Sequence, residues 1–203
     1  MKNTKKHKEY WANRKIDWKT SYLDTWDHPH RQLLVWILKT IPFYSLWEVG
    51  CGPGANLKKI VQEIPNKQLG GSDVNPEAIE LAQKTFKGGL FHVESGEDLL
   101  MSDNSVDVIL SDACLIYVDP TKIKKYLNEY KRVARSHIVL CELHEKNLWK
   151  RFTYWLKTGY FMYDYKKLLD KLGYWDIRLT KIPKEFWPGT PWEQHGYIIT
   201  AKI

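Results

Sequence analysis

The sequence predicts an α/β protein with a doubly wound, mostly parallel sheet and helices on both of its faces. Short apolar segments alternate with amphipathic helical segments five times between about residues 46 and 142. A glycine-rich turn joins the first of these strands to the first helix, as in nucleotide-binding α/β folds. The 203 residues are enough for one large core, so we expect a single domain over residues 1–203.

The first predicted strand, Leu46–Val49, runs into a turn that contains Gly50, Gly52 and Gly54. Glycines accept a positive φ and let a ligand approach the backbone closely. The following helix would point its free N–H groups at an anionic group. Its buried stripe is predicted from residues at i, i+3, i+4 and i+7, namely Leu57, Ile60, Val61 and Ile64. A turn of this kind also serves simply to pack a helix onto a sheet.

The second predicted strand ends at Asp73, 21 positions after Gly52. Asn75 is expected to cap the next helix, with Pro76 in its first position. In a βαβ unit Asp73 would lie at the carboxyl end of the neighbouring strand, where a carboxylate accepts hydrogen bonds from both ribose hydroxyls of a nucleotide.

The later elements continue the alternation. A helix is predicted over 123–134, from a buried stripe that ends in Val133 and Ala134, and His137–Glu142 is a continuous apolar run typical of parallel strands. Another apolar helix stripe begins at Tyr165 and is closed by Gly173. Two last strands are expected, Trp175–Thr180 and Tyr197–Ala201, with a Pro-rich turn region between them.

The residues around the glycine turn separate two classes of cofactor. Gly50, Gly52 and Ala55 fit a dinucleotide fingerprint in which Ala replaces the last glycine. Glu48, however, would repel a pyrophosphate, whereas it suits a cofactor that carries ammonium and sulfonium groups. The pattern Glu48-x-Gly50-x-Gly52-x-Gly54 resembles the first motif of the class I S-adenosylmethionine-dependent methyltransferases.

The resemblance covers roughly residues 40–145 and implies S-adenosyl-L-methionine as the cofactor, with S-adenosyl-L-homocysteine as the product. It also implies a seven-stranded sheet with an antiparallel last strand. Extra N-terminal helices are expected to form a cover over 1–40, followed by a cofactor-binding core over 41–145. Residues 146–203 would supply the acceptor side and the last two strands.

The resemblance also implies roles for individual residues. The loop that begins at Ser95 would hold the adenine ring, although the family usually has Asp at this position. Residues at the end of the fourth strand would lie beside the methionine end of the cofactor, whose carboxylate Arg31 or Tyr22 is placed to reach. The expected cofactor-binding residues are Glu48, Gly50, Cys51, Gly52, Gly54, Asn56, Asp73, Val74, Ser95, Gly96, Glu97, Asp112, Ala113 and Arg31.

For the methyl acceptor, the family's acceptor pocket is commonly formed by the two flanks of the chain. Both flanks are rich in tryptophan here, since only Trp47 of ten lies within the cofactor core. As proton acceptors we expect His144 and Glu142, just after the fifth strand, or Asp112, with His28 and His30 as further options. The histidines are otherwise scattered, and no metal-ligating cluster is expected.

The charge composition bears on which classes of partner the protein binds. The formal net charge is +7, and basic residues are concentrated in two segments. One predicted helix contains Lys122, Lys124, Lys125, Lys131 and Arg132. The N-terminal segment contains Lys2, Lys5, Lys6, Lys8, Arg14, Lys15 and Lys19. Such a surface could hold RNA, but acidic residues are interspersed, which favours a solvated face.

No apolar run approaches the roughly 20 residues that a membrane span needs, and no signal peptide is recognisable. We therefore expect a cytoplasmic protein without a membrane partner. Cys51, Cys114 and Cys141 are expected to be ordinary buried thiols.

The sequence thus favours an enzyme that methylates an oxygen or nitrogen atom of a small molecule, such as a sugar or another metabolite. Three alternatives remain open. They are an RNA methyltransferase, a nicotinamide-dependent oxidoreductase and a non-catalytic cofactor-binding module.

Overall fold

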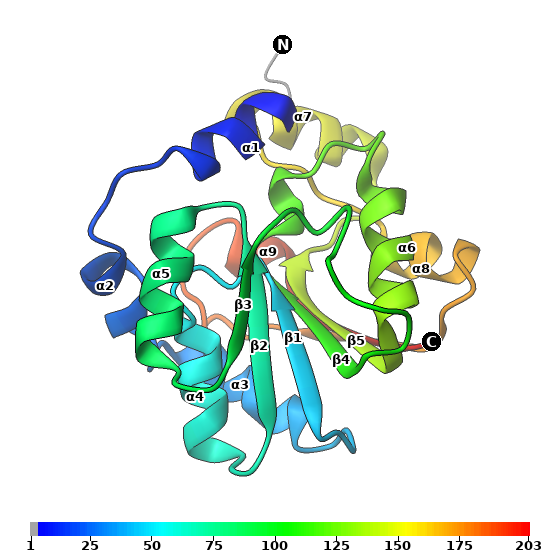
Figure 1. The fold of residues 1–203 in the computed structure, drawn as a ribbon. Coiled ribbons are helices and arrows are strands. Elements are labelled where there is room, and N and C mark those ends of the chain that lie inside the picture. Colours follow the sequence, from blue (N-terminus) through cyan, green and yellow to red (C-terminus); the bar gives the residue numbers. More distant parts are fainter. Residues whose placement is uncertain (1–3) are drawn as a thin grey trace.

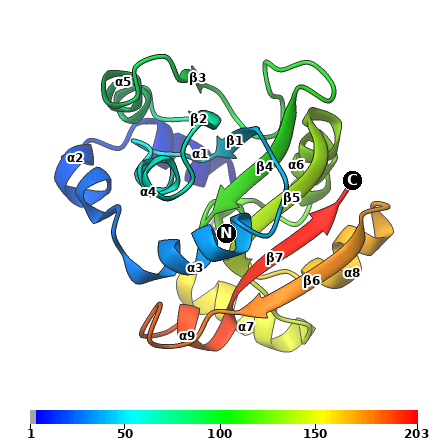
Figure 2. The ribbon, with the colours of Figure 1, turned by 90° about the horizontal axis from the view of Figure 1, so that it is seen from below.

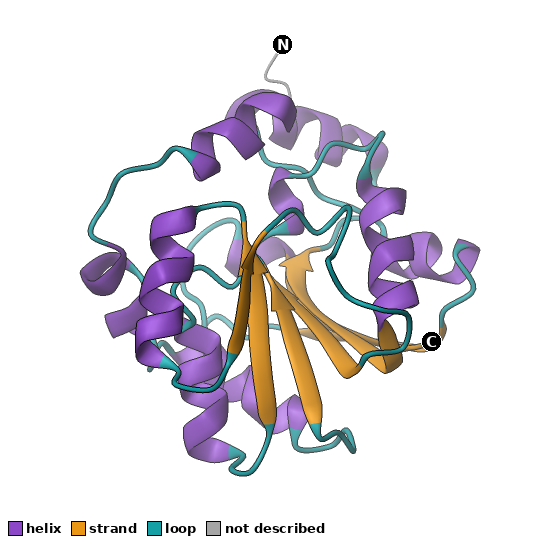
Figure 3. Ribbon diagram, viewed as in Figure 1, coloured by secondary structure: helices purple, strands orange, loops and turns teal. Residues whose placement is uncertain are grey.

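The computed structural model describes residues 4–203, which fold around one seven-stranded sheet (Figures 1 and 3). The strands are β1 (Ser45–Val49), β2 (Gln68–Asp73), β3 (Leu90–Val93), β4 (Val106–Asp112), β5 (Ala134–Leu143), β6 (Trp175–Lys181) and β7 (Gly196–Lys202). The helices are α1 (Thr4–Ala12), α2 (Trp18–Ser21), α3 (Pro29–Leu38), α4 (Ala55–Glu63), α5 (Pro76–Thr85), α6 (Ile123–Val133), α7 (Leu148–Thr158), α8 (Tyr165–Lys171) and α9 (Trp192–His195), with 3-10 turns η1 (Leu23–Thr25) and η2 (Leu115–Tyr117).

The strand order is β3-β2-β1-β4-β5-β7-β6. Strands β1 to β5 are all parallel to one another. Strand β7 lies between β5 and β6 and is antiparallel to both (Figure 2). The predicted fold class is therefore confirmed, including the antiparallel last strand. In register, Val49 of β1 pairs with Ser72 of β2 and with Ser111 of β4. The residues that follow these three strands consequently meet at one edge of the sheet.

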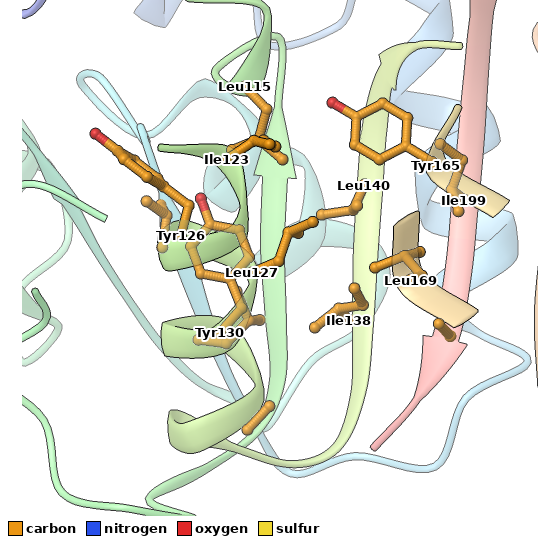
Figure 4. Close-up of a cluster of buried hydrophobic side chains, with 14 of the residues drawn as sticks. Leu115, Ile123, Tyr126, Leu127, Tyr130, Ile138, Leu140, Tyr165, Leu169 and Ile199 are labelled. Atoms are coloured by element: carbon orange, nitrogen blue, oxygen red, sulfur yellow. The ribbon is translucent and has the colours of Figure 1, made fainter. Parts of the chain in front are cut away.

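The core has two layers, one on each face of the sheet. Figure 4 shows Leu127 and Tyr130 of α6 directed at Ile138 and Leu140 of β5, with α8 covering the same face further along. The opposite face is covered by apolar side chains of α3, α4 and α5, including Leu34, which is fully buried. Helices on both faces keep the backbone of the parallel strands away from water.

Local predictions for the helices hold with two corrections. The side chain of Asn75 accepts hydrogen bonds from the N–H groups of Glu77 and Ala78, which confirms the predicted cap of α5. Val61, by contrast, is 45% exposed, because α4 buries Leu57 and Ile60 on a narrower stripe. The 123–134 helix ends at Val133, and Ala134 already belongs to β5.

The N-terminal elements lie across the carboxyl edge of the sheet. Helix α1 lies above that edge in Figure 1, and the Asn75 side chain donates hydrogen bonds to the carbonyls of Trp11 and Arg14, at distances of 2.7 and 3.0 Å. These two bonds fasten the segment after α1 to the start of α5. Of the predicted basic residues, Lys2 lies outside the described residues. No helix within residues 4–203 combines the length and the apolarity that crossing a membrane requires.

Candidate cofactor and acceptor site

A cavity of about 390 Å³ lies at the carboxyl edge of β1, β2 and β4, beneath the N-terminal elements. Its walls come from segments that are far apart in the sequence. They are lined by the β1–α4 turn, the ends of β2 and β4, the loop after β3 and aromatic residues of the flanks: Glu48, Val49, Gly50, Cys51, Gly52, Pro53, Ala55, Asn56, Asp73, Val74, Glu94, Ser95, Gly96, Asp112, Ala113, Cys114, Trp11, Trp18, Tyr22, Tyr117, Tyr126 and Trp187 among others.

The glycine turn forms one wall because its backbone takes positive φ values. Gly50 (φ 76°) and Cys51 both donate their N–H groups to the carbonyl of Ser72, which ties the turn to β2. Gly52 (φ 52°) lines the cavity, and beyond its neighbours in the chain no atom lies within 4 Å of the position that a Cβ would occupy. The space beside this glycine is therefore open. Gly54 does not line the cavity; a Cβ there would lie 2.5 Å from the Phe86 ring, so its role is packing.

Asp73 lies beside this turn, as the sequence predicts. Its carboxylate accepts hydrogen bonds from the N–H groups of Gly52 and Asn75, each at 2.9 Å. Burial raises the pKa of Asp73, and those backbone N–H groups oppose the rise. The structure therefore holds the carboxylate in a fixed orientation at the cavity wall, next to Val74.

Two buried carboxyl groups face each other across the side chain of Asn56. Its Nδ2 donates to Glu48 Oε1 at 2.6 Å and to Asp112 Oδ2 at 2.9 Å, while Arg31 Nε donates to its Oδ1 at 2.7 Å. Glu48 Oε2 and Asp112 Oδ1 are buried and have no hydrogen-bond partner within the described residues. Both residues line the cavity, and a cationic group bound there would satisfy these two buried oxygens once Glu48 is ionised.

The two carboxyl groups differ in charge. Burial raises the pKa of Glu48 to about 8, and the nearby charge of Asp112 adds to this rise. For Asp112, burial also opposes ionisation, but His30, Arg31 and Asn56 together lower its pKa to about 2. At neutral pH, Asp112 therefore carries the negative charge and Glu48 is mostly protonated.

A chain of imidazole rings leads from Asp112 to the cavity surface. His30 Nε2 lies 2.9 Å from Asp112 Oδ2, and the Nδ1 atoms of His28 and His30 are 2.6 Å apart. Because an ionised carboxylate only accepts, His30 Nε2 carries a proton, and one of the two Nδ1 atoms donates to the other. Burial, followed by the charges of His30 and Arg31, lowers the pKa of His28 to about 4. His28 is consequently neutral at pH 7.

The predicted adenine loop lines the cavity only in part. Ser95 Oγ and the Tyr126 hydroxyl are 2.9 Å apart, and Gly96 is pressed so closely against Val49 and Tyr126 that a Cβ would collide with both. Glu97 does not line the cavity, since its carboxylate pairs with Lys122 at 3.1 Å and with Lys8 at 3.6 Å. Its pKa is lowered, because these lysines outweigh the effect of burial.

The structure does not bring His144 and Glu142 to the cavity. Glu142 is fully buried, accepts hydrogen bonds from the N–H groups of Cys114 and Leu115, and has a pKa raised by burial to about 8. His144 Nδ1 accepts from the N–H of Tyr165 at the start of α8. Both side chains therefore hold loops and helix ends in place.

Three features of the cavity add to the residues singled out from the sequence. Trp187 lies on His30, with ring centroids 4.0 Å apart, and stacks on Trp192 at 3.9 Å. The sequence signal for Trp187 is the richness of the C-terminal flank in tryptophan. Cys114 is half-buried and lines the cavity, whereas Cys51 and Cys141 are buried as expected.

The third feature is a cluster of side chains with potential metal-ligand atoms, whose members lie far apart in the sequence. Ligand atoms of His30, Asp112 and Cys141 lie within 4.8 Å of one another, a grouping that the scattered positions of these residues in the sequence do not indicate. The hydrogen bond between His30 and Asp112 accounts for the proximity of these two side chains.

Comparison with known proteins agrees with this geometry. Residues 47–137 match the family model of a methyltransferase domain. A candidate O-methyltransferase from Nostoc punctiforme superimposes with a TM-score of 0.68 at 15% identity over 87% of this chain, which spans 56% of that longer protein.

Two further solved structures are similar over most of their length. Magnesium protoporphyrin IX methyltransferase from Synechocystis, with bound SAH, gives a TM-score of 0.66 at 13% identity and 98% coverage of both chains. A SAM-dependent methyltransferase from Methanosarcina mazei gives 0.63 at 20% identity, covering 82% of this chain and 96% of its own. At these identities the likeness establishes the shared fold.

Proposed function

We propose that this chain, which has a methyltransferase domain and the class I fold, transfers a methyl group from S-adenosylmethionine to an oxygen or nitrogen atom of a small-molecule acceptor. The observation that carries the proposal is the pair of buried carboxyl groups, Glu48 and Asp112, beside the glycine turn. Each has one oxygen without a partner in the described part of the chain. This site suits a cation and is unsuitable for the pyrophosphate of a nicotinamide cofactor.

The residues present fit the methyl donor. S-adenosylmethionine supplies an electrophilic methyl group on a sulfonium centre. In the proposal, Glu48 and Asp112 bind its ammonium group, while Arg31, held by Asn56 and by the Thr25 carbonyl, faces its carboxylate. Binding of the cation would favour the ionised form of Glu48, because an adjacent positive charge stabilises the carboxylate.

The remaining contacts follow the cavity from the turn to the far wall. Asp73 is placed to accept hydrogen bonds from the ribose hydroxyls, and Val74 to pack against the base. Ser95 and Gly96 lie where the adenine edge is expected. The backbone close to the ligand comes from Cys51, Gly52 and Ala113. Of the predicted cofactor-binding residues, only Gly54 and Glu97 do not line the cavity.

For the acceptor, we assign proton removal to His28. In this scheme His28 Nδ1–H donates to His30 Nδ1, so that Nε2 carries the lone pair, and the negative charge of Asp112 favours a proton there against the effect of burial. His28 touches the acceptor in this scheme, while His30 and Asp112 are positioning residues. The aromatic rings of Trp187, Trp18 and Tyr22 line the cavity and exclude water from the acceptor.

The basic surface gives little support to an RNA substrate. Lys122 pairs with Glu97, and Arg132 pairs with Glu129 and Asp103. Lys131 donates to the carbonyls of Leu172 and Gly173. These residues of α6 are therefore largely engaged within the protein, and a small-molecule acceptor is the favoured substrate class.

The cofactor assignment is tested by calorimetric titration with S-adenosylmethionine, S-adenosylhomocysteine and NAD. We expect about micromolar Kd values for the first two. Asp73→Ala should weaken both at least about tenfold, because it removes charged hydrogen-bond acceptors. Asp170→Ala, at an exposed position on α8, serves as the matched control. Binding of NAD alone would exclude the methyltransferase assignment.

The acceptor is tested with radiolabelled methyl donor against panels of hydroxyl and amine metabolites and against RNA. For the acceptor that is labelled, His28→Gln should lower kcat about 10² to 10⁴-fold. His137→Gln, a half-buried histidine on β5, should leave kcat unchanged. Labelling of RNA alone would reject the small-molecule class, and cofactor binding without any labelled product would indicate a non-catalytic module.

A further inference from the structure

Helix α7 exposes the apolar face that a helix of a globular domain normally buries. None of its 11 residues is buried. Leu148 and Trp149 are 71% and 75% exposed, and Phe152 and Leu156 are 48% and 58% exposed. By contrast, α3, α4, α5, α6 and α8 each bury apolar residues against the sheet. Large exposed apolar groups that lie together mark an interaction surface.

The four exposed side chains form one continuous stripe. Because successive residues turn by about 100° around a helix, these four fall within one arc of about 100°. The side of α7 next to Leu148 faces the protein, where Trp155 stacks on Phe161 and Arg151 donates to the Met162 carbonyl at 2.8 Å, and Tyr154 packs against the protein on the side opposite the stripe. The helix is therefore anchored by one side and presents the stripe outward.

Positive charge lines one flank of the stripe. Lys157 and Lys150 are exposed about 80° and 100° further around the helix than Trp149, and Lys146 precedes the helix. The sequence contains no acidic residue from Lys146 to Tyr163. These three lysines form no ion pair with the side chains that the structure describes. A surface that combines Trp, Phe and Leu with uncompensated lysines complements a face that is both apolar and anionic.

We propose that α7 binds the surface of an anionic lipid bilayer, with its exposed stripe in the headgroup region and its lysines against the lipid phosphates. Tryptophan and phenylalanine favour this interfacial layer, and lysines add attraction to acidic headgroups. The formal net charge of +7 acts in the same direction at long range. The expectation that the chain has no membrane partner rested on the absence of a spanning run, and a helix that lies on the surface needs none.

The position of α7 places this surface close to the cavity. Helices α7 and α1 lie at the same end of the molecule, beyond the carboxyl edge of the sheet (Figure 1). Tyr160, which follows α7, contacts Tyr117 of the cavity wall with ring centroids 5.4 Å apart, and Tyr117 contacts Trp11 at 5.2 Å. A bilayer bound to α7 would therefore lie one layer of aromatic rings from the cavity. The binding itself does not depend on methyl transfer.

The test is co-sedimentation of the full chain with vesicles of phosphatidylcholine and phosphatidylserine in a ratio of about 7:3, and with phosphatidylcholine alone. We expect binding to the mixed vesicles to be at least about tenfold tighter, and to weaken as salt is added. The double variant Trp149→Ala, Phe152→Ala should lose at least about tenfold in affinity. Trp36→Ala, at a half-exposed tryptophan on α3, should not.

A second pair of variants tests the charge separately. Lys150→Glu with Lys157→Glu should abolish the preference for acidic lipid, while Lys84→Glu on α5 with Lys87→Glu just after it, both at exposed positions, should keep it. Absence of wild-type binding to the acidic vesicles would overturn the proposal. So would a wild-type dimer that the Trp149→Ala, Phe152→Ala variant converts to monomer, because the stripe would then be an interface between two copies.

Discussion

Replacing Glu48 by Gln is expected to make the protein more stable above neutral pH and to weaken its binding of S-adenosylmethionine. Glu48 is buried between Asn56 and the cavity, and one of its carboxyl oxygens has no partner in the described structure. Gln has the same size and keeps the oxygen that accepts from Asn56 Nδ2. It cannot ionise, so it removes the cost of burying a charge without removing the packing.

The magnitude follows from the pKa of this carboxyl group. It is raised from 4.5 to about 8, first by burial. Between these pH values the unfolded chain has released the proton while the folded protein keeps it, so the free energy of unfolding falls as pH rises. The fall is about 1.4 kcal/mol for each pH unit, or about 3 kcal/mol between pH 4.5 and pH 7. Glu48→Gln should recover about that amount at pH 7.

The assay is urea denaturation of wild type and variant at several values between pH 5 and pH 8, with calorimetric titration of S-adenosylmethionine alongside. Glu142→Gln is the matched control, because burial also raises the pKa of Glu142 to about 8 and its side chain lies away from the cavity. It should flatten the pH dependence and leave cofactor affinity unchanged. If Glu48→Gln shows the wild-type pH dependence, the burial argument is refuted, and unchanged affinity would refute the proposed contact with the ammonium group.

Four further variants test the fold. Leu57→Ala should cost about 2–5 kcal/mol of unfolding free energy, whereas Val61→Ala should cost less than about 0.5 kcal/mol, and equal losses in thermal denaturation would contradict the observed stripe of α4. Asn75→Ala removes the cap of α5 and its bonds to the N-terminal segment, so it should lose about 1–2 kcal/mol and speed proteolysis of the first 15 residues. Proteolysis at the wild-type rate would show that other contacts fix that segment. Gly54→Ala should destabilise by about 1–3 kcal/mol, because its φ of 88° and the nearby Phe86 ring both oppose a side chain, and a wild-type melting temperature would rule this out.

The cofactor wall could be predicted because its residues depend on local chemistry and on one general property of parallel sheets. The glycines at positions 50 and 52 follow a strand directly, and Asp73 ends the next strand with the Asn75 cap behind it. The carboxyl ends of neighbouring parallel strands meet at one edge. Position in the sequence therefore suffices to bring these residues and Asp112 together, without knowledge of the packing.

The contacts of His28 and His30 and the exposure of the apolar stripe of α7 depended on tertiary structure. Alternate residues of a strand point to opposite faces, so Cys141 approaches His30 and Asp112 while its neighbour Glu142 turns toward the backbone of Cys114. His28 reaches this group from the N-terminal flank. The sequence shows that α7 is amphipathic, but only the packing decides whether its apolar stripe is covered. The sequence by itself thus determined the fold and the cofactor class. The tertiary structure decided which side chains of the flanks line the cavity. Local spacing does not encode the direction of these side chains or the packing of segments that are far apart in the chain.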